Sequence, residues 1–139
     1  MIHYLLVVRW RDIDLDMCSI SVSQVLYKRS GVCKFNAPKT SHSKCNVSMT
    51  LKLALFLREY RLEREKLYFE LEKELTLDDL VFASVEGKPI DPGVLSHSFA
   101  RIAKSAGLEN VQFHDLRHTF ASLMLLRGAK PKVLGKVEK

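Results

Sequence analysis

The sequence has 139 residues, 47% hydrophobic and 27% charged, which is typical of one folded domain and excludes a disordered chain. Lysine and arginine outnumber aspartate and glutamate by 22 to 16, and the formal net charge of +6 favours nucleic acid over a membrane surface as partner. Three cysteines without a C-x-x-C pair indicate free thiols in a reducing compartment. The apolar N-terminal run is too short for a signal peptide or membrane span because Arg9 ends it, so we expect a cytoplasmic protein.

The first fifty residues favour short extended segments. Leu5–Trp10 is typical of the end of an apolar helix or strand, and an acidic turn over Asp12–Asp16 follows. Alternating residues over Ser19–Leu26 predict a half-buried strand, which ends before Gly31. Cys45–Met49 predicts a short strand that closes an antiparallel hairpin or meander.

Three helices are predicted in the rest of the chain. The first runs from Thr50 to about Leu75 and is expected to be a solvated amphipathic helix, with a coiled-coil partner helix as the alternative. Its apolar stripe consists of Leu53, Leu57, Tyr60, Arg64, Leu67 and Leu71. After a brief extended segment at Leu80–Ala83, Asp91 and Pro92 predict the cap and first turn of a second helix.

Glycines predict where the second and third helices end. Gly107 is a natural stop for the second helix and Gly128 for the third, which runs from about His114 to Arg127. The residues expected to face inward are Val94, Leu95, Phe99, Ile102, Ala103 and Ala106 on the second helix and Leu116, Phe120, Leu123 and Met124 on the third. Strands followed by helices indicate an α+β or mainly helical domain with a small sheet.

The densest polar cluster lies at the start of the third helix. His114 and Arg117 are three residues apart on one face, where free backbone N–H groups and the helix dipole attract a phosphate. Arginine can bind two phosphate oxygens with its planar fork, and histidine can transfer a proton near neutral pH. Spacing alone fits ordinary capping and surface histidines better.

Other chemistries lack their motifs. His114 and His118 stand four apart, but Asp115 replaces the glutamate of the H-E-x-x-H motif, no third ligand is obvious and Arg117 would repel a cation, so no metal is expected. No Gly-rich phosphate loop or dinucleotide-binding turn is present, which argues against a nucleotide, and no G-x-S-x-G elbow supports a hydrolase. No cofactor is therefore predicted.

Four segments in register resemble the tyrosine recombinases, the phage-integrase family. Phe113–Ser122, with Gly128-Ala129 and Pro131–Val133 behind it, resembles the second conserved box of the family. Leu5–Asp14 resembles the L-R-W-x-D-I-D stretch that follows the family's first catalytic arginine. The two remaining matches are Ala37-Pro38-Lys39-Thr40 with Ser43 and Lys44, similar to the P-K-T-x-x-S-x-R hairpin, and Val81-Phe82 with Gly87–Ile90 and Ser96…Phe99, similar to the V-F…G-x-P and helix segments.

The resemblance implies a mainly helical α+β catalytic-domain fragment with a small antiparallel three-stranded sheet near the N-terminus. It also implies DNA strand cleavage and rejoining through a phosphotyrosyl intermediate, for which Lys39, His114 and Arg117 are the expected catalytic residues. Arg117 would neutralise the phosphate, His114 would hold it or transfer a proton, and Lys39 would protonate the leaving oxygen. The expected contacts to double-stranded DNA are Arg9, Lys28, Arg29, Lys34, Lys44 and His118, the last as a packing or supporting residue.

The sequence also departs from the family pattern. The first catalytic arginine falls at about Met1, Leu134-Gly135-Lys136 stands where L-G-H is expected, and no tyrosine follows Tyr68. We therefore expect residues 1–139 to be a partial catalytic domain, without the N-terminal arm and the nucleophile segment, that is inactive alone and derived from a mobile element.

Two alternatives remain open. The chain could be a non-catalytic DNA-binding or regulatory remnant that joins a full-length recombinase subunit. It could also have no selected role and be marginally stable, with exposed apolar surface expected at Leu5–Val8 and Val133–Leu134.

Overall fold

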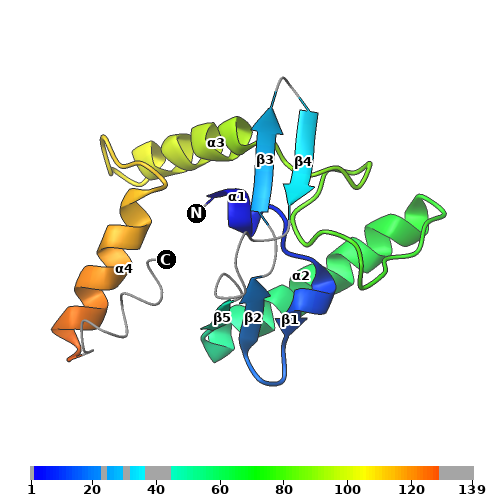
Figure 1. Cartoon of the computed structure of the whole chain (residues 1–139), viewed down its shortest axis with the longest axis horizontal. Coiled ribbons are helices and arrows are strands. Elements are labelled where there is room, and N and C mark those ends of the chain that lie inside the picture. The colour runs from blue at the N-terminus through cyan, green and yellow to red at the C-terminus, as the bar shows by residue number, and fades with distance from the viewer. Residues whose placement is uncertain (1, 23–24, 30–31, 37–44, 129–139) are drawn as a thin grey trace. The chain divides into compact units, whose positions relative to one another are not determined.

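The computed structural model describes residues 2–22, 25–29, 32–36 and 45–128. These residues form two compact units, one over Ile2–Pro89 and the other from Ile90 onward, and each is described by itself (Figure 1). The elements of the first unit are α1 (Ile2–Leu5), the 3₁₀ turn η1 (Trp10–Asp12), β1 (Ile13–Asp14), β2 (Ser19–Val22), β3 (Val25–Arg29), β4 (Val32–Asn36), β5 (Cys45–Ser48) and α2 (Leu51–Glu70). Those of the second are α3 (Pro92–Ser105) and α4 (Asp115–Leu126).

A three-stranded antiparallel sheet of order β1-β2-β5 confirms the predicted small sheet. Ile20 is the central position, paired with Ile13 on one side and Val47 on the other. The strand predicted over Ser19–Leu26 is two strands in the structure, because β2 belongs to this sheet whereas β3 pairs with β4 in a separate ladder. The position of Gly31 falls outside the described residues.

The acidic segment forms β1 and the turn that leads to β2. Asp14 Oδ1 accepts hydrogen bonds from the N–H groups of Asp16 at 3.1 Å and Met17 at 2.9 Å. An aspartate that bonds to the backbone two residues onward stabilises a turn. The predicted acidic turn therefore begins at Asp14, one residue after β1 has started.

Helix α2 begins where predicted and ends five residues early. Thr50 caps its start and accepts from the Leu53 N–H at 3.2 Å. At the other end Glu72 adopts a left-handed φ of 56°, and the Lys73 N–H returns to the Tyr68 carbonyl at 2.8 Å. This is the hydrogen bond of a Schellman C-cap, so the helix stops although leucine, glutamate and lysine continue to Leu75.

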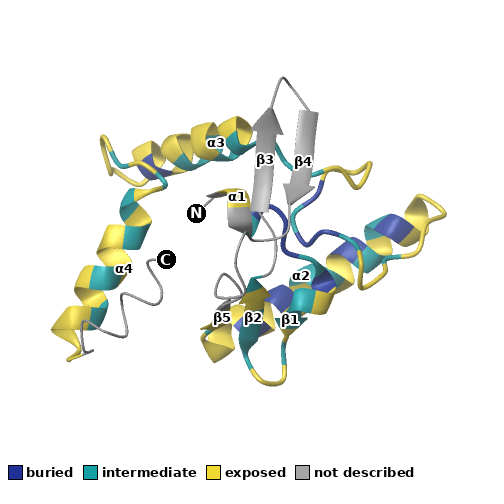
Figure 2. Cartoon of the chain, in the orientation of Figure 1, coloured by how far each residue is buried: buried dark blue, intermediate teal, exposed yellow. Residues whose placement is uncertain are grey.

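The buried face of α2 is rotated from the predicted stripe. Its buried residues are Ala54, Leu57, Arg64 and Tyr68. The predicted stripe residues Leu53 and Leu71 are 42% and 39% exposed. Figure 2 shows the buried positions of α2 alternating with exposed ones along the helix. Apolar residues occur on both faces of α2, so the periodicity could not identify which face packs.

The core of the first unit joins the N-terminal segment to a distant strand-like segment. Val8, Trp10, Leu57 and Val81 form the buried cluster. The Val81 N–H donates to the Val8 carbonyl at 2.9 Å, and the Trp10 N–H donates to the Asp79 carbonyl at 3.1 Å. These long-range bonds hold the two segments together.

The expected exposure of Leu5–Val8 is therefore wrong. Leu6, Val7 and Val8 are 1%, 2% and 5% exposed, because the backbone pairing draws residues 77–81 over this part of the chain. The second segment of that expectation, Val133–Leu134, lies outside the described residues. No helix in the described part of the chain is sufficiently long and apolar to cross a membrane.

The second unit confirms the predicted helix boundaries. Asp91 Oδ1 accepts from the Gly93 N–H at 2.8 Å, with Pro92 in the first turn. Gly107 and Gly128 follow the two helices with φ values of 78° and 83°, a conformation that glycine adopts without a Cβ clash.

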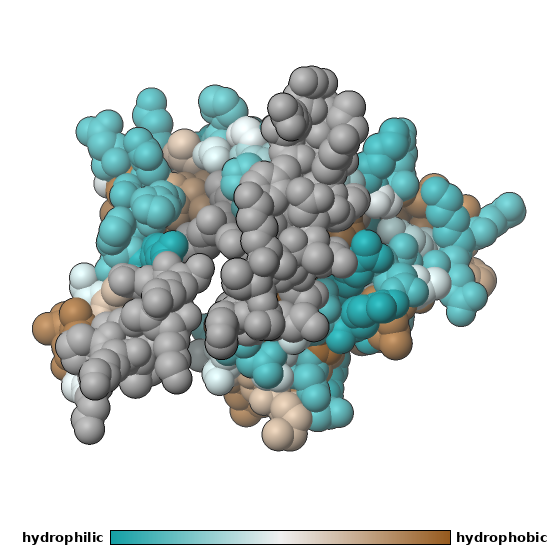
Figure 3. Space-filling view, viewed as in Figure 1, coloured by the Kyte–Doolittle hydropathy of each residue, from teal (hydrophilic) through white to brown (hydrophobic). Residues whose placement is uncertain are grey.

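The predicted inward faces of α3 and α4 are largely exposed. On α3, Ala103 is 5% exposed, whereas Val94 and Ile102 are 58% and 63% exposed. On α4, Phe120 and Leu123 are 49% and 54% exposed, and Figure 2 shows no buried residue on this helix. Apolar side chains are also visible on the surface in Figure 3. An apolar helix face is buried only against a second layer, and the described part of this unit consists of two helices and a loop.

Replacing Asp91 with alanine should lower the free energy of unfolding by about 1 kcal/mol, because the Gly93 N–H at the start of α3 loses its acceptor. Urea denaturation followed by circular dichroism measures the change. Asp16→Ala is the matched control, since its side chain is 93% exposed and makes a surface ion pair with Arg58. Equal destabilisation by both variants would contradict the capping role.

Candidate functional site

A reciprocal pair of hydrogen bonds sets the start of α4. The Gln112 N–H donates to Asp115 Oδ2 at 2.7 Å, and the Asp115 N–H donates to the Gln112 carbonyl at 3.0 Å. His114, between them, has helical angles of φ −65° and ψ −28°. The chain therefore winds as a helix before the first residue of α4, and positions 114, 117 and 118 keep helical spacing.

An aromatic contact fixes the loop that precedes this helix. The rings of Phe99, on α3, and Phe113 meet edge to face with centroids 5.4 Å apart. Edge-to-face pairs of this separation contribute about 1 kcal/mol beyond their buried area. The start of α4 is thus anchored to α3 one residue before His114.

We expected free N–H groups at the start of this helix, and the structure corrects that expectation. The N–H groups of residues 115, 116 and 117 each donate to the carbonyl three residues earlier, at 3.0, 3.3 and 3.1 Å. Such 3₁₀-type bonds use donors that an α-helix leaves open. A phosphate at this site must therefore be bound by side chains, with the helix dipole in support.

The structure brings three predicted site residues together on the first turns of α4. The exposed rings of His114 and His118 lie edge to face, with centroids 5.2 Å apart and an interplanar angle of 81°. Arg117 is half-buried and lies three residues from His114, on the same side of the helix. An arginine and a histidine at this spacing share one side of the helix, and such a pair can bind a phosphate oxygen and exchange a proton with it.

The remaining predicted site residues belong to the first unit. Lys28 and Arg29 are on β3 and Lys34 is on β4, where the backbone register pairs Lys28 with Cys33 and Lys34 with Tyr27. Lys39 and Lys44 lie outside the described residues.

Arg9 makes contacts within the protein. Its Nη1 donates to the Asp78 carbonyl at 2.9 Å, and its backbone N–H donates to Asp12 Oδ2 at 2.9 Å. These bonds attach the segment before η1 to the loop at Asp78. Contact of Arg9 with DNA remains a prediction.

One of the buried residues of α2 is an arginine, Arg64. The periodicity of the sequence placed Arg64 in the apolar stripe but did not explain why a charged residue should be there. Arg64 is 9% exposed, its guanidinium lies 5.2 Å from the centre of the Tyr68 ring, and Nη2 donates to the Ser84 carbonyl at 3.4 Å. The Lys88 N–H donates to Ser84 Oγ at 3.2 Å. Arg64 therefore supports the Ser84–Lys88 turn from inside the unit.

The same turn carries an exposed ion pair. Lys88 Nζ lies 2.7 Å from Glu86 Oε2. The hydrogen bond from Lys88, aided by its charge, lowers the pKa of Glu86, and the same bond raises the pKa of Lys88. Both side chains are largely exposed, so this ion pair contributes little to stability.

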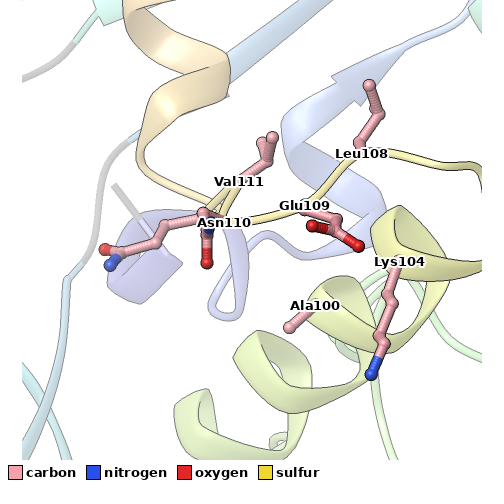
Figure 4. A pocket seen from close by; sticks show the side chains of 7 residues that line it. Ala100, Lys104, Leu108, Glu109, Asn110 and Val111 are labelled. Carbon is pink, nitrogen blue, oxygen red and sulfur yellow. The ribbon is translucent and has the colours of Figure 1, made fainter.

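A hollow of about 540 Å³ lies between the C-terminal half of α3 and the loop before α4 (Figure 4). Its lining residues, which sequence reasoning did not select, are Ala100, Lys104, Leu108, Glu109, Asn110, Val111 and Gln112. Lys104 and Glu109 bring opposite charges to it, so it does not favour an anion as His114 and Arg117 do.

The phage integrase family model matches residues 4–137. The chain belongs to the phage integrase family. The curated relatives include the ICEBs1 integrase of Bacillus subtilis (strain 168), 27% identical over 124 residues that cover 89% of this chain and 33% of the relative. Another is a tyrosine recombinase XerC-like protein of Caldanaerobacter subterraneus subsp. tengcongensis, 27% identical over 146 residues that cover 96% of this chain and 37% of the relative.

Solved structures show the same fold. The Tn1549 transposon integrase in complex with transposon right end DNA matches with a TM-score of 0.77 and 22% identity, over 99% of this chain and 45% of that chain. The XerA recombinase matches with a TM-score of 0.73 and 22% identity, over 98% of this chain and 42% of the recombinase chain. The predicted tyrosine recombinase catalytic-domain fold is therefore confirmed. The chain spans about a third of the length of these curated relatives.

Proposed function

We propose that this chain binds double-stranded DNA as part of a site-specific tyrosine recombinase, with the scissile phosphate at the start of α4. The observation that carries the proposal is the placement of His114 and Arg117 on one helical turn within the matched family region. The net charge of +6 favours the same partner. Four of the neighbouring structures are of the Tn1549 transposon integrase in complex with DNA, which supports this choice of substrate.

Arg117 and His114 have different roles at the phosphate. The charged fork of Arg117 binds two of its oxygens and offsets the negative charge that builds up when the phosphate is attacked. The His114 imidazole, exposed beside it, donates a hydrogen bond or transfers a proton. Lys39 is proposed to protonate the departing 5′-oxygen, as the family resemblance of its hairpin implies.

The attacking tyrosine is proposed to come from outside these 139 residues. The four tyrosines of the sequence are Tyr4, Tyr27, Tyr60 and Tyr68, all upstream of Arg117 and outside the family's nucleophile position. Tyr68 is buried against Arg64, and Tyr60 donates to the Val81 carbonyl at 3.2 Å. The 139-residue chain therefore binds DNA without forming a covalent link to it.

Two measurements on the 139-residue chain test this proposal. Fluorescence anisotropy with a labelled duplex should show binding that weakens as salt rises, with a log–log slope of about −0.9 for each phosphate contact. A nicked suicide duplex, analysed on a denaturing gel, should show no covalent adduct. A salt-independent signal or no binding would contradict the DNA role, and an adduct would contradict the assignment of the nucleophile.

A further inference from the structure

Helix α2 has a second apolar face, on the side opposite the one that packs into the core. Leu55, Leu62 and Phe69 are 51%, 54% and 83% exposed, and they follow one another at intervals of seven residues. They therefore form one line of about 21 Å along the helix. Figure 2 shows exposed positions along the whole of α2. With the charged residues between them, the members of this outer face are Lys52, Leu55, Glu59, Leu62, Lys66 and Phe69.

The spacing of the outer face is that of a helix that packs along another helix. Its members follow one another in alternating steps of three and four residues, which is the seam pattern of paired helices. Single exposed apolar residues are ordinary on a protein surface, whereas a continuous apolar line marks a surface for contact.

The charges of the outer face select the partner. Glu59 and Lys66 are exposed and lie three and four residues from Leu62, on either side of it. Within the described residues neither side chain makes a hydrogen bond or an ion pair, whereas the adjacent Arg61 is paired with Glu65 at 3.0 Å. One negative and one positive charge thus remain available on the two sides of Leu62. A surface with this arrangement is complementary to itself, as the contact between two identical subunits requires.

We propose that the outer face of α2 binds the same face of a second copy of this chain, with the two helices antiparallel and crossing at Leu62. A two-fold axis beside Leu62 sets Glu59 against Lys66 of the second copy, within one residue of helix rise, about 1.5 Å. The axis repeats this pair on the other side of Leu62. It also sets Leu55 against Phe69 of the second copy, so that apolar meets apolar at both ends.

The charges exclude a parallel arrangement of the two helices. A parallel copy would set Glu59 against Glu59 and Lys66 against Lys66, and like charges held close together are unfavourable. In the antiparallel arrangement, Lys52 also approaches Glu70 of the second copy, which is exposed at the end of α2. The contact involves one 20-residue helix from each copy, so we expect a weak, reversible dimer whose subunits keep their own cores.

Sedimentation velocity of the 139-residue chain, without DNA and at increasing protein concentration, tests for this dimer. We expect a monomer–dimer equilibrium. Leu62→Gln should weaken the dimer by about 100-fold, because an apolar contact is lost from both copies. Leu77→Gln is the matched control, since Leu77 is 55% exposed and lies outside α2, and it should leave the equilibrium unchanged.

Charge variants test the antiparallel pairing separately. Glu59→Lys and Lys66→Glu should each weaken the dimer by about 10-fold, because the axis repeats each like-charge pair that they create. A mixture of the two variants joins a chain with two lysines at these positions to a chain with two glutamates. The mixture should therefore recover the affinity of the unmodified chain.

Three results would overturn the proposal. They are a monomer at every concentration, a dimer that Leu62→Gln leaves intact, and charge variants whose mixture fails to recover. Association lost in Leu123→Gln but not in Leu62→Gln would place the contact on α4, where Leu123 is 54% exposed, and would also overturn it. Circular dichroism checks folding, and the charge variants decide if Leu62→Gln unfolds. The DNA proposal is independent of these results, because the Arg117 variants test it.

Discussion

Replacing Arg117 with alanine should weaken duplex DNA binding by about 10- to 100-fold, the range expected when a hydrogen bond to a charged group is lost. The slope of log affinity against log salt should also become shallower by about one unit, because one phosphate contact is removed. Fluorescence anisotropy at several salt concentrations measures both quantities. Circular dichroism shows whether α4 is intact in the variant.

Two further variants separate the geometry of Arg117 from its charge. Arg117→Lys keeps the positive charge but loses the planar fork of the guanidinium. Compared with Arg117→Ala, it should therefore restore the slope of log affinity against log salt more fully than the affinity itself. Arg127→Ala removes an exposed arginine at the other end of the same helix and should change affinity little. Equal losses in the Arg117 and Arg127 alanine variants would show that net charge alone drives binding.

Replacing Trp10 with alanine should lower the free energy of unfolding by about 3–5 kcal/mol. Trp10 is 2% exposed and belongs to the core cluster with Val8, Leu57 and Val81. Its ring also lies 6.1 Å from that of Tyr60 and under the Arg61 guanidinium at 5.5 Å. A loss of this size is a large fraction of a typical domain's stability.

Urea denaturation measures the effect, with Phe69→Ala as the control. Phe69 is 83% exposed on α2, so its removal should change the free energy of unfolding by less than about 0.5 kcal/mol. Should the Trp10 variant not fold, Leu57→Ala tests the same cluster with an expected cost of about 2–5 kcal/mol. Similar values for the core and control variants would contradict the assigned core.

Local chemistry allowed the helix boundaries to be predicted. The side chain of Asp91 caps the start of α3, and the backbone angles of Gly107 and Gly128 end the two helices. Each of these residues lies within one turn of the boundary that it sets. The end of α2 was missed because Glu72 adopts a left-handed conformation that its residue type does not favour.

Burial could not be predicted in the same way, because it depends on segments far apart in the sequence. Leu6, Val7 and Val8 are covered by backbone pairing with residues some seventy positions onward, which no local pattern encodes. Conversely, Phe120 and Leu123 form an apolar face on α4 that the described residues do not cover. A helical stripe shows which residues could be buried and not whether a second layer meets them.

The placement of three candidate residues on α4 could be predicted from the sequence, and their role in DNA chemistry stays a prediction. His114, Arg117 and His118 are close in sequence, so a correct helix start was enough to place them on one surface. The sequence did not reveal that the first N–H groups of α4 are already hydrogen-bonded to backbone carbonyls. The reason is that the Gln112–Asp115 pair tightens the turn before this helix. Lys39 depends on a segment outside the described residues, and its role stays a prediction.

The central claim, that DNA binds at the start of α4, is tested most directly by chemical-shift mapping of the ¹⁵N-labelled chain with a short duplex. We expect the largest changes at residues 112–118, including the His114 ring and the Arg117 guanidinium signals. The C-terminal half of α2, which includes Glu63 and Glu70, should change little. Changes confined to other regions, with those of residues 112–118 unaffected at saturating DNA, would contradict it.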